Sequence, residues 1–182
     1  ARCDWVLSLD ADEALSNELR REIDLVLSES GPDHAGYRLC WLTHAFDREL
    51  SFGHWARAPL RLFRRDQARF TPVAVHEKVV LDKGLRVGFL EAPLRHYVYR
   101  DIEHAQGKLC RYAELQAGER HGKGRRVRSP LTPFLRAGVN WLDNMVLRTA
   151  FLDGRAGWIM CSLYARYTYD KYQRLRELSQ AS

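Results

Sequence analysis

The 182-residue chain lacks several features that would place it in a common protein class at once. Its four cysteines, Cys3, Cys40, Cys110 and Cys161, lie far apart and form no Cys-x-x-Cys pair. This spacing argues against a zinc knuckle or a disulfide framework and favours a reducing cytosol. The residues contain no signal-peptide pattern, no apolar run long enough to span a bilayer, and no internal repeat.

The composition is that of a folded domain with an excess of positive charge. Hydrophobic residues make up 46% of the chain and charged residues 29%, which is typical of a globular protein with a core. The net charge of +6 favours anionic partners such as phosphates, nucleic acid or an acidic membrane surface. The length fits one domain, or a core with an appendage.

The most distinctive motif follows the first apolar run. Residues 4–10 are expected to form a fully buried strand, whose apolar run ends in Asp10 and Asp12 with Glu13 behind them. Carboxylates at this spacing suit a hard divalent ion such as Mg²⁺ or Mn²⁺, which takes further ligands from substrate phosphates. The alternative is an Asp-rich turn that caps the next helix.

Hydrophobic periodicity predicts a mixed α/β core in residues 1–100, followed by a helical extension in residues 101–182. The expected strands cover residues 4–10, 37–43, 60–64, 73–81, 87–90 and 94–99, with a hairpin turn at 82–84. The expected helices cover residues 15–27, 102–113, 134–147 and 158–178, the first capped by Ser16. Residues 120–128 are expected to form a flexible basic loop.

Four further residues are candidates for chemistry, each with a structural alternative. Glu77 lies on the apolar face of a strand, where a raised pKa would suit a general base, but an ion pair is the competing interpretation. His96 ends another strand and could join Asp10 and Asp12 as a metal ligand, or serve only as a hydrogen-bonded structural histidine. Arg61 and Arg64 could clamp a phosphate, or they could belong to a solvated charged turn.

The helical extension combines aromatic and basic residues, as helices at a membrane interface do. The alternatives are an ordinary helix-pair core and packing on a partner subunit. The residues concerned are Trp141, Trp158, Tyr164, Tyr167, Tyr169, Tyr172, Arg148, Arg155, Arg166, Lys171 and Arg174.

In this order, several segments resemble family-2 glycosyltransferases, and bacterial lipopolysaccharide core glucosyltransferases in particular. The segments are Trp5–Glu13, Arg61–Arg65, Val75–Val79, His96–Ile102 and Leu152–Gly157. The resemblance implies a GT-A fold of the α/β class, and inverting transfer of a sugar from a nucleotide-sugar donor, such as a UDP-sugar, to a lipid-linked cell-envelope glycan. It also implies a cytoplasmic enzyme, peripheral to the inner face of the cell membrane, that does not bind nucleic acid.

The resemblance assigns roles to single residues. Asp10, Asp12 and His96 match the residues that hold a divalent metal and the donor diphosphate. Glu77 matches the catalytic base, and Arg61 and Arg64 are weaker matches near the phosphate or the acceptor.

The chain starts with Ala1 and enters its first predicted strand almost at once. The resemblance therefore leads us to expect that roughly 80–100 residues precede it, which would complete a domain of usual size. On that expectation the isolated fragment is inactive. The alternative function is a non-catalytic basic scaffold module that contacts anionic lipid or nucleic acid.

Overall fold

A computed structural model describes residues 3–28, 34–71 and 78–181 of the chain. The chain divides into two compact units. The first unit comprises Ala1–Thr43 and Ala56–Tyr97, and the second comprises His44–Trp55 and Val98–Ser182. The sequence placed its boundary after residue 100 and did not assign His44–Trp55 to the helical part.

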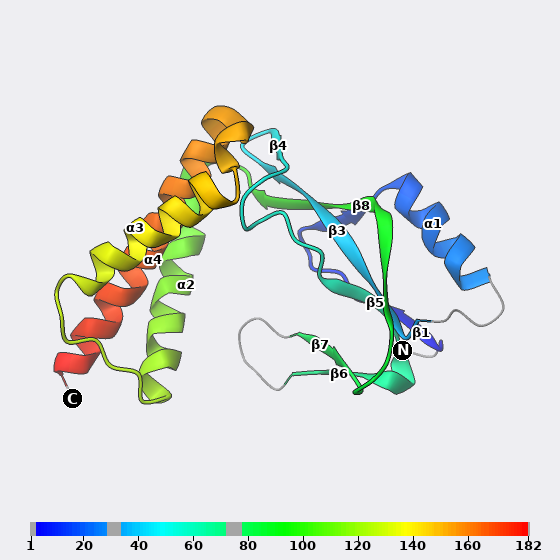
Figure 1. Ribbon diagram of the computed structural model, residues 1–182, viewed down its shortest axis with the longest axis horizontal. Coiled ribbons are helices and arrows are strands. Elements are labelled where there is room, and N and C mark those ends of the chain that lie inside the picture. The colour runs from blue at the N-terminus through cyan, green and yellow to red at the C-terminus, as the bar shows by residue number, and fades with distance from the viewer. Residues whose placement is uncertain (1–2, 29–33, 72–77, 182) are drawn as a thin grey trace. The chain divides into compact units, whose positions relative to one another are not determined.

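The first unit is built on a sheet with the strand order β1-β5-β3-β8-β2 (Figure 1). Its strands are β1 (Trp5–Leu7), β2 (Glu13–Leu15), β3 (Gly36–Ala45), β5 (Leu60–Arg64) and β8 (Val87–Tyr99). The pairs β1–β5, β3–β5 and β2–β8 are antiparallel. The sequence predicted a fully buried first strand, and this is wrong, because β1 ends the strand order and its residues are only half-buried. A short apolar run does not by itself distinguish an edge strand from a central one.

Helix α1 (Asn17–Ser28) packs on this sheet through Leu19 and Ile23. The predicted cap is confirmed, because the Oγ atom of Ser16 accepts a hydrogen bond from the Leu19 N–H at 3.0 Å. The core of the unit consists of Leu19, Ile23, Tyr37, Leu39, Leu62, Leu90 and Leu94.

Two predictions about the strands of this unit are wrong. The turn at residues 82–84 does not join a hairpin, because β7 (Val79–Leu81) pairs with β6 (Ala68–Phe70), which follows a short 3-10 turn, η1 (Arg65–Gln67). In addition, Pro93 does not separate two strands but lies within β8. The pairing of β8 with β2 covers Leu94–His96, so Pro93 lies just outside that ladder.

The second unit is a bundle in which α2 (Ile102–Gly122), α3 (Thr132–Leu142) and α4 (Gly154–Gln180) pack together (Figure 1). A π-helical turn, η2 (Asp143–Leu147), and a 3-10 turn, η3 (Ala150–Asp153), connect α3 to α4. The predicted helices are confirmed in place, but α2 continues into the basic segment that was expected to be a loop. Arg120 and His121 lie in the last turn of α2, where cations are favoured by the helix dipole.

The segment His44–Trp55 belongs to the bundle unit through hydrogen bonds to its helices. Asp153 accepts the backbone N–H groups of Ser51 and Phe52 at 3.0 and 3.1 Å. The side-chain Oδ1 of Asn144 accepts the N–H of His54 at 3.0 Å. The segment contains β4 (Arg48–Leu50), which pairs with β3.

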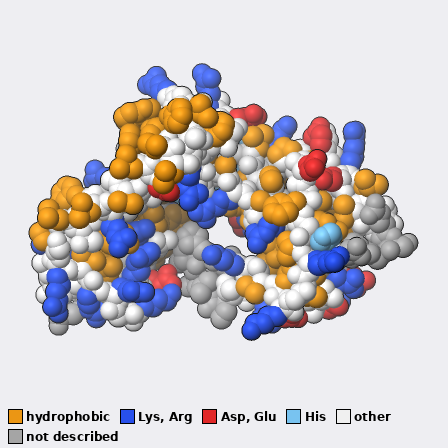
Figure 2. All heavy atoms as spheres, viewed as in Figure 1, with side chains coloured by type: hydrophobic (Ala, Val, Ile, Leu, Met, Phe, Trp, Pro, Cys, Tyr) orange, Lys and Arg blue, Asp and Glu red, His pale blue; other side chains and the backbone are white. Residues whose placement is uncertain are grey.

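The bundle leaves much of its apolar surface exposed. No helix in the described part of the chain is long and apolar enough to cross a membrane. Most aromatic residues of α4 pack inward, whereas large hydrophobic side chains on α3, η2 and η3 face outward (Figure 2). The exposed ones are Leu131, Phe134, Leu135, Val139, Leu142, Val146, Leu147, Phe151 and Leu152.

Candidate functional site

The Asp-x-Asp motif forms a turn that connects β1 to β2 within the first unit. The N–H of Glu13 donates to the backbone oxygen of Asp10 at 3.0 Å, and the N–H of Asp10 donates to Oε2 of Glu13 at 2.9 Å. Strand β1 is fixed to β5, and Glu13 pairs with His96 in β8. Because strands hold both ends of the turn, Asp10 and Asp12 project from a rigid support.

Glu13 is the buried centre of this arrangement. Its side chain has no exposed surface, and its Oε1 accepts from Trp41 Nε1 at 2.7 Å and from Arg61 Nη2 at 2.5 Å. The same Nη2 of Arg61 also donates to Asp10. A buried carboxylate is tolerated when it is paired and hydrogen-bonded, as Glu13 is. Glu13 and Arg61 therefore fix the position of Asp10.

Asp12 faces a different partner. Its Oδ1 lies 3.7 Å from Nε2 of His96, and its backbone oxygen accepts the N–H of Tyr97 at 2.8 Å. The His96 ring stacks on Trp41 with 4.3 Å between ring centroids. The side chain of Asp12 is 31% exposed and that of His96 is 14% exposed, so both can be reached from solvent.

The structure brings four of the six predicted site residues together: Asp10, Asp12, Arg61 and His96. Arg64 is not among them, because residues three apart on a strand point to opposite faces. Its Nε lies 3.5 Å from Oδ1 of Asp66, and the Arg64 side chain is partly exposed and that of Asp66 mostly exposed. Glu77, the predicted base, lies outside the described residues.

Sequence reasoning did not single out Trp41, and it gave Glu13 no role. Trp41 reaches the site from β3, and no motif surrounds it. The sequence signal for a role of Glu13 was the acidic run itself. Three carboxylates close together at a strand end need a cationic side chain nearby to balance their charge. Such a cation is distant in sequence, so pairing of β1 with β5 was needed to reveal it.

Asp12 and His96 fit a divalent ion in part. Two ligand atoms about 2.1 Å from one ion are separated by about 3.0–3.5 Å, close to the 3.7 Å between Asp12 Oδ1 and His96 Nε2. Asp10 is instead engaged by Arg61. Among the described residues, no group of three or more His, Cys, Asp or Glu side chains is arranged to hold a metal. Within residues 3–28, 34–71 and 78–181 the site thus offers two ligands, and other groups such as water or a phosphate-bearing ligand would complete the shell.

Comparison with known proteins links the chain to a group of bacterial proteins. It is 26% identical over 187 residues to a protein of Rickettsia typhi, and 27% identical over 188 residues to proteins of Rickettsia bellii and Rickettsia prowazekii. All three are named uncharacterized glycosyltransferases. The alignments cover 97% of this chain and 63% of each relative, so the chain spans less than two thirds of their length. No protein-family model and no solved structure matches it.

Proposed function

We propose that the chain forms part of an inverting glycosyltransferase of family 2 with a GT-A fold. The observation that carries the proposal is the alignment over 97% of the chain with proteins named glycosyltransferases. The mixed α/β architecture and the cluster of Asp10, Asp12 and His96 are compatible with it. The proposed donor is a UDP-sugar, with UDP-glucose the first to test, and the proposed acceptor is a lipopolysaccharide-core or other envelope glycan.

In the proposed reaction, a hydroxyl oxygen of the acceptor bonds to the anomeric carbon of the donor sugar. The bond from that carbon to the diphosphate oxygen breaks, and its electron pair leaves with the diphosphate. A carboxylate takes the hydroxyl proton, and Glu77 is the residue proposed for this step. Attack opposite the leaving group inverts the configuration at the anomeric carbon.

Asp12 and His96 would hold Mg²⁺ or Mn²⁺, which when bound supplies positive charge beside the leaving diphosphate. We propose that Arg61 is a positioning residue, because its guanidinium already contacts Asp10 and Glu13. Trp41 has a similar role, since its ring supports His96 and its N–H holds Glu13. Arg64 points to the other face of β5, so it is a weaker candidate for contact with the diphosphate.

The test is the thermal stability of the complete protein that carries these residues, measured with Mn²⁺ and UDP. A ligand at a hundred times its Kd stabilises a protein by about 2.7 kcal/mol, or roughly 5–10 °C for a domain of this size. Asp12→Asn and His96→Gln should each abolish the shift. Asp66→Asn is the matched control, because Asp66 is an exposed carboxylate of the same unit and should leave the shift unchanged.

Two results would overturn the proposal. One is the absence of any UDP-dependent shift in the complete protein. The other is an equal shift in the wild type, Asp12→Asn and His96→Gln. If neither result is found, release of UDP from a UDP-sugar in the presence of a lipopolysaccharide-core acceptor would distinguish catalysis from binding alone.

Peripheral contact with a membrane is also a proposal. Its support is the exposed apolar surface of α3, η2 and η3, since a soluble monomer rarely exposes large contiguous apolar patches. An acceptor carried by lipid would require the enzyme to work at such a surface.

A further inference from the structure

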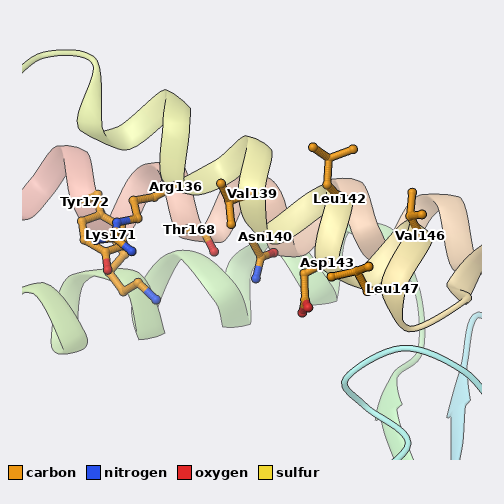
Figure 3. A pocket seen from close by; sticks show the side chains of 10 residues that line it. All are labelled: Arg136, Val139, Asn140, Leu142, Asp143, Val146, Leu147, Thr168, Lys171 and Tyr172. Atoms are coloured by element: carbon orange, nitrogen blue, oxygen red, sulfur yellow. The ribbon is translucent and has the colours of Figure 1, made fainter.

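The bundle unit contains a groove between α3 and α4 with a volume of about 600 Å³. One end is cationic and aromatic, with Arg136, Lys171 and Tyr172 (Figure 3). The other end is apolar, with Leu142, Val146 and Leu147 (Figure 3). This polarity matches a molecule that has an anionic head and a hydrocarbon tail.

The cationic end carries positive charge without a matching carboxylate. Lys171 is only 9% exposed, and its Nζ lies 4.5 Å from the centre of the Tyr167 ring. The guanidinium carbons of Arg120 and Arg136 lie 5.5 and 5.6 Å from the ring of Tyr172. Within the described part of the chain, none of these three cations forms a salt bridge.

Burial of the Lys171 ammonium group without a carboxylate partner costs free energy, and a bound anion would reduce that cost. Burial, together with the smaller effect of nearby Arg120, lowers the pKa of Lys171 to about 8. An anion in the groove would offset both effects, because it would favour the protonated amine. The cationic end of the groove therefore suits the anionic group of a ligand.

The middle of the groove is lined by polar side chains. Asn140 and Thr168 lie between the two ends, and Oδ1 of Asn140 is buried without a hydrogen-bond partner in the described residues. Asp143 also lines the groove, but its Oδ2 is paired with Arg148 Nε at 2.7 Å. The negative charge of Asp143 is therefore balanced by Arg148 and does not repel an anion in the groove.

The apolar end opens onto a larger exposed surface. Val139, Leu142, Val146 and Leu147 are 64%, 55%, 55% and 79% exposed. Hydrophobic side chains gather over this part of the bundle, and Lys and Arg side chains lie around them (Figure 2). A lipid whose tail remains in a bilayer could thus place its head group among the cations.

We propose that this groove binds the phosphate head group of an anionic membrane phospholipid. Lys171 and Arg136 contact the phosphate, and Leu142, Val146 and Leu147 contact the acyl chain. The site lies wholly within the bundle unit and does not depend on sugar transfer. It goes beyond peripheral attachment, because it assigns a lipid-specific site to named side chains.

The experiment measures binding of the protein to vesicles of phosphatidylglycerol mixed with phosphatidylcholine, against vesicles of phosphatidylcholine alone. Lys171→Met and Arg136→Met each remove one cation from the groove. Arg166→Met is the matched control, because Arg166 lies on α4, is 75% exposed and pairs with Asp170. Arg136 is exposed, so its replacement leaves the fold intact if Lys171→Met disturbs it.

Loss of one surface positive charge weakens attraction to an anionic bilayer by about fivefold. Loss of a charge-assisted contact to phosphate should weaken it by roughly tenfold or more. We therefore expect at least tenfold weaker binding for Lys171→Met and Arg136→Met, and at most about fivefold for Arg166→Met. Leu147→Ser should weaken binding to both kinds of vesicle.

Equal effects of the Lys171, Arg136 and Arg166 substitutions would overturn the proposal in favour of general electrostatic attraction. Displacement of the protein from vesicles by inorganic phosphate, with loss of that competition in Lys171→Met, would make the groove a site for free anions instead. Neither result bears on the UDP-dependent thermal shift, so failure of this proposal is distinguishable from failure of the proposed function.

Discussion

Replacement of Arg61 by Met tests whether the buried ion pair holds the Asp10–Glu13 turn in place. Arg61→Met keeps much of the side-chain volume but removes the guanidinium from Glu13. The side chain of Glu13 has no exposed surface, and that of Arg61 is only 12% exposed. Removal of one partner of such a pair leaves a buried charge and costs about 3–5 kcal/mol. That is a large share of the roughly 5–15 kcal/mol by which a protein is usually stable.

Arg64→Met is the matched control, because Arg64 lies on the same strand. Its side chain is 36% exposed and that of its partner Asp66 is 63% exposed. An exposed pair of this kind contributes at most about 1 kcal/mol. A second substitution, Glu13→Gln, in the Arg61→Met background removes the buried charge and keeps an acceptor for Trp41 Nε1. We expect it to restore about 2 kcal/mol of the loss.

The assay is amide hydrogen exchange of β3 and β5 as a function of urea concentration. β5 and residues 36–43 of β3 lie in the first unit, so exchange of their amides reports the unit that contains the pair. A difference of less than about 1 kcal/mol between the losses caused by Arg61→Met and Arg64→Met would mean that the buried pair does not hold the turn. A larger loss of stability in the double variant Arg61→Met/Glu13→Gln than in Arg61→Met alone would mean the same.

Two further predictions concern the bundle unit. The pKa of Lys171 is about 8 in the folded chain against an ordinary lysine value of 10.5, so the unfolded state binds more protons between these pH values. Stability should therefore rise by about 1.5 kcal/mol from roughly pH 8 to 9.5, and urea titrations should find this rise absent in Lys171→Met. A Cβ atom on Gly157 would lie 1.9 Å from the backbone oxygen of Ala150, whereas one on Gly118 would meet nothing within 4 Å. Gly157→Ala should then lower the free energy of unfolding by about 1–3 kcal/mol. Gly118→Ala, in the exposed part of α2, should raise it by about 0.5–1 kcal/mol. Equal effects of the two substitutions on thermal unfolding would contradict the close packing at Gly157.

Local features of the fold could be predicted from the sequence. Helix α1 and its cap at Ser16 follow from short-range periodicity and from the preference of hydroxyl side chains for that position. The helices of the bundle follow from the same periodicity. The lengths were less accurate, since α2 absorbs part of the basic segment and α3 gives way to a π-helical turn.

Strand partners could not be predicted, because pairing depends on contacts between residues far apart in the chain. β7 pairs with β6, and β8 runs unbroken through Pro93. The alternation of polar and apolar residues tells which face a side chain occupies, but not which strand lies beside it. The expected hairpin at residues 82–84 failed for this reason.

Local sequence patterns are enough to predict that Asp10 and Asp12 follow a strand and that the bundle is rich in aromatic and basic residues. Long-range packing was needed to show that Arg61 and Glu13 fix Asp10, that Asp12 faces His96, and that Arg64 is turned away. It also decided that Lys171 is buried beside tyrosine rings, while apolar side chains of α3 are exposed. The physical reason is that charge and polarity are local properties of a residue, whereas burial and partners depend on which distant segments pack against it.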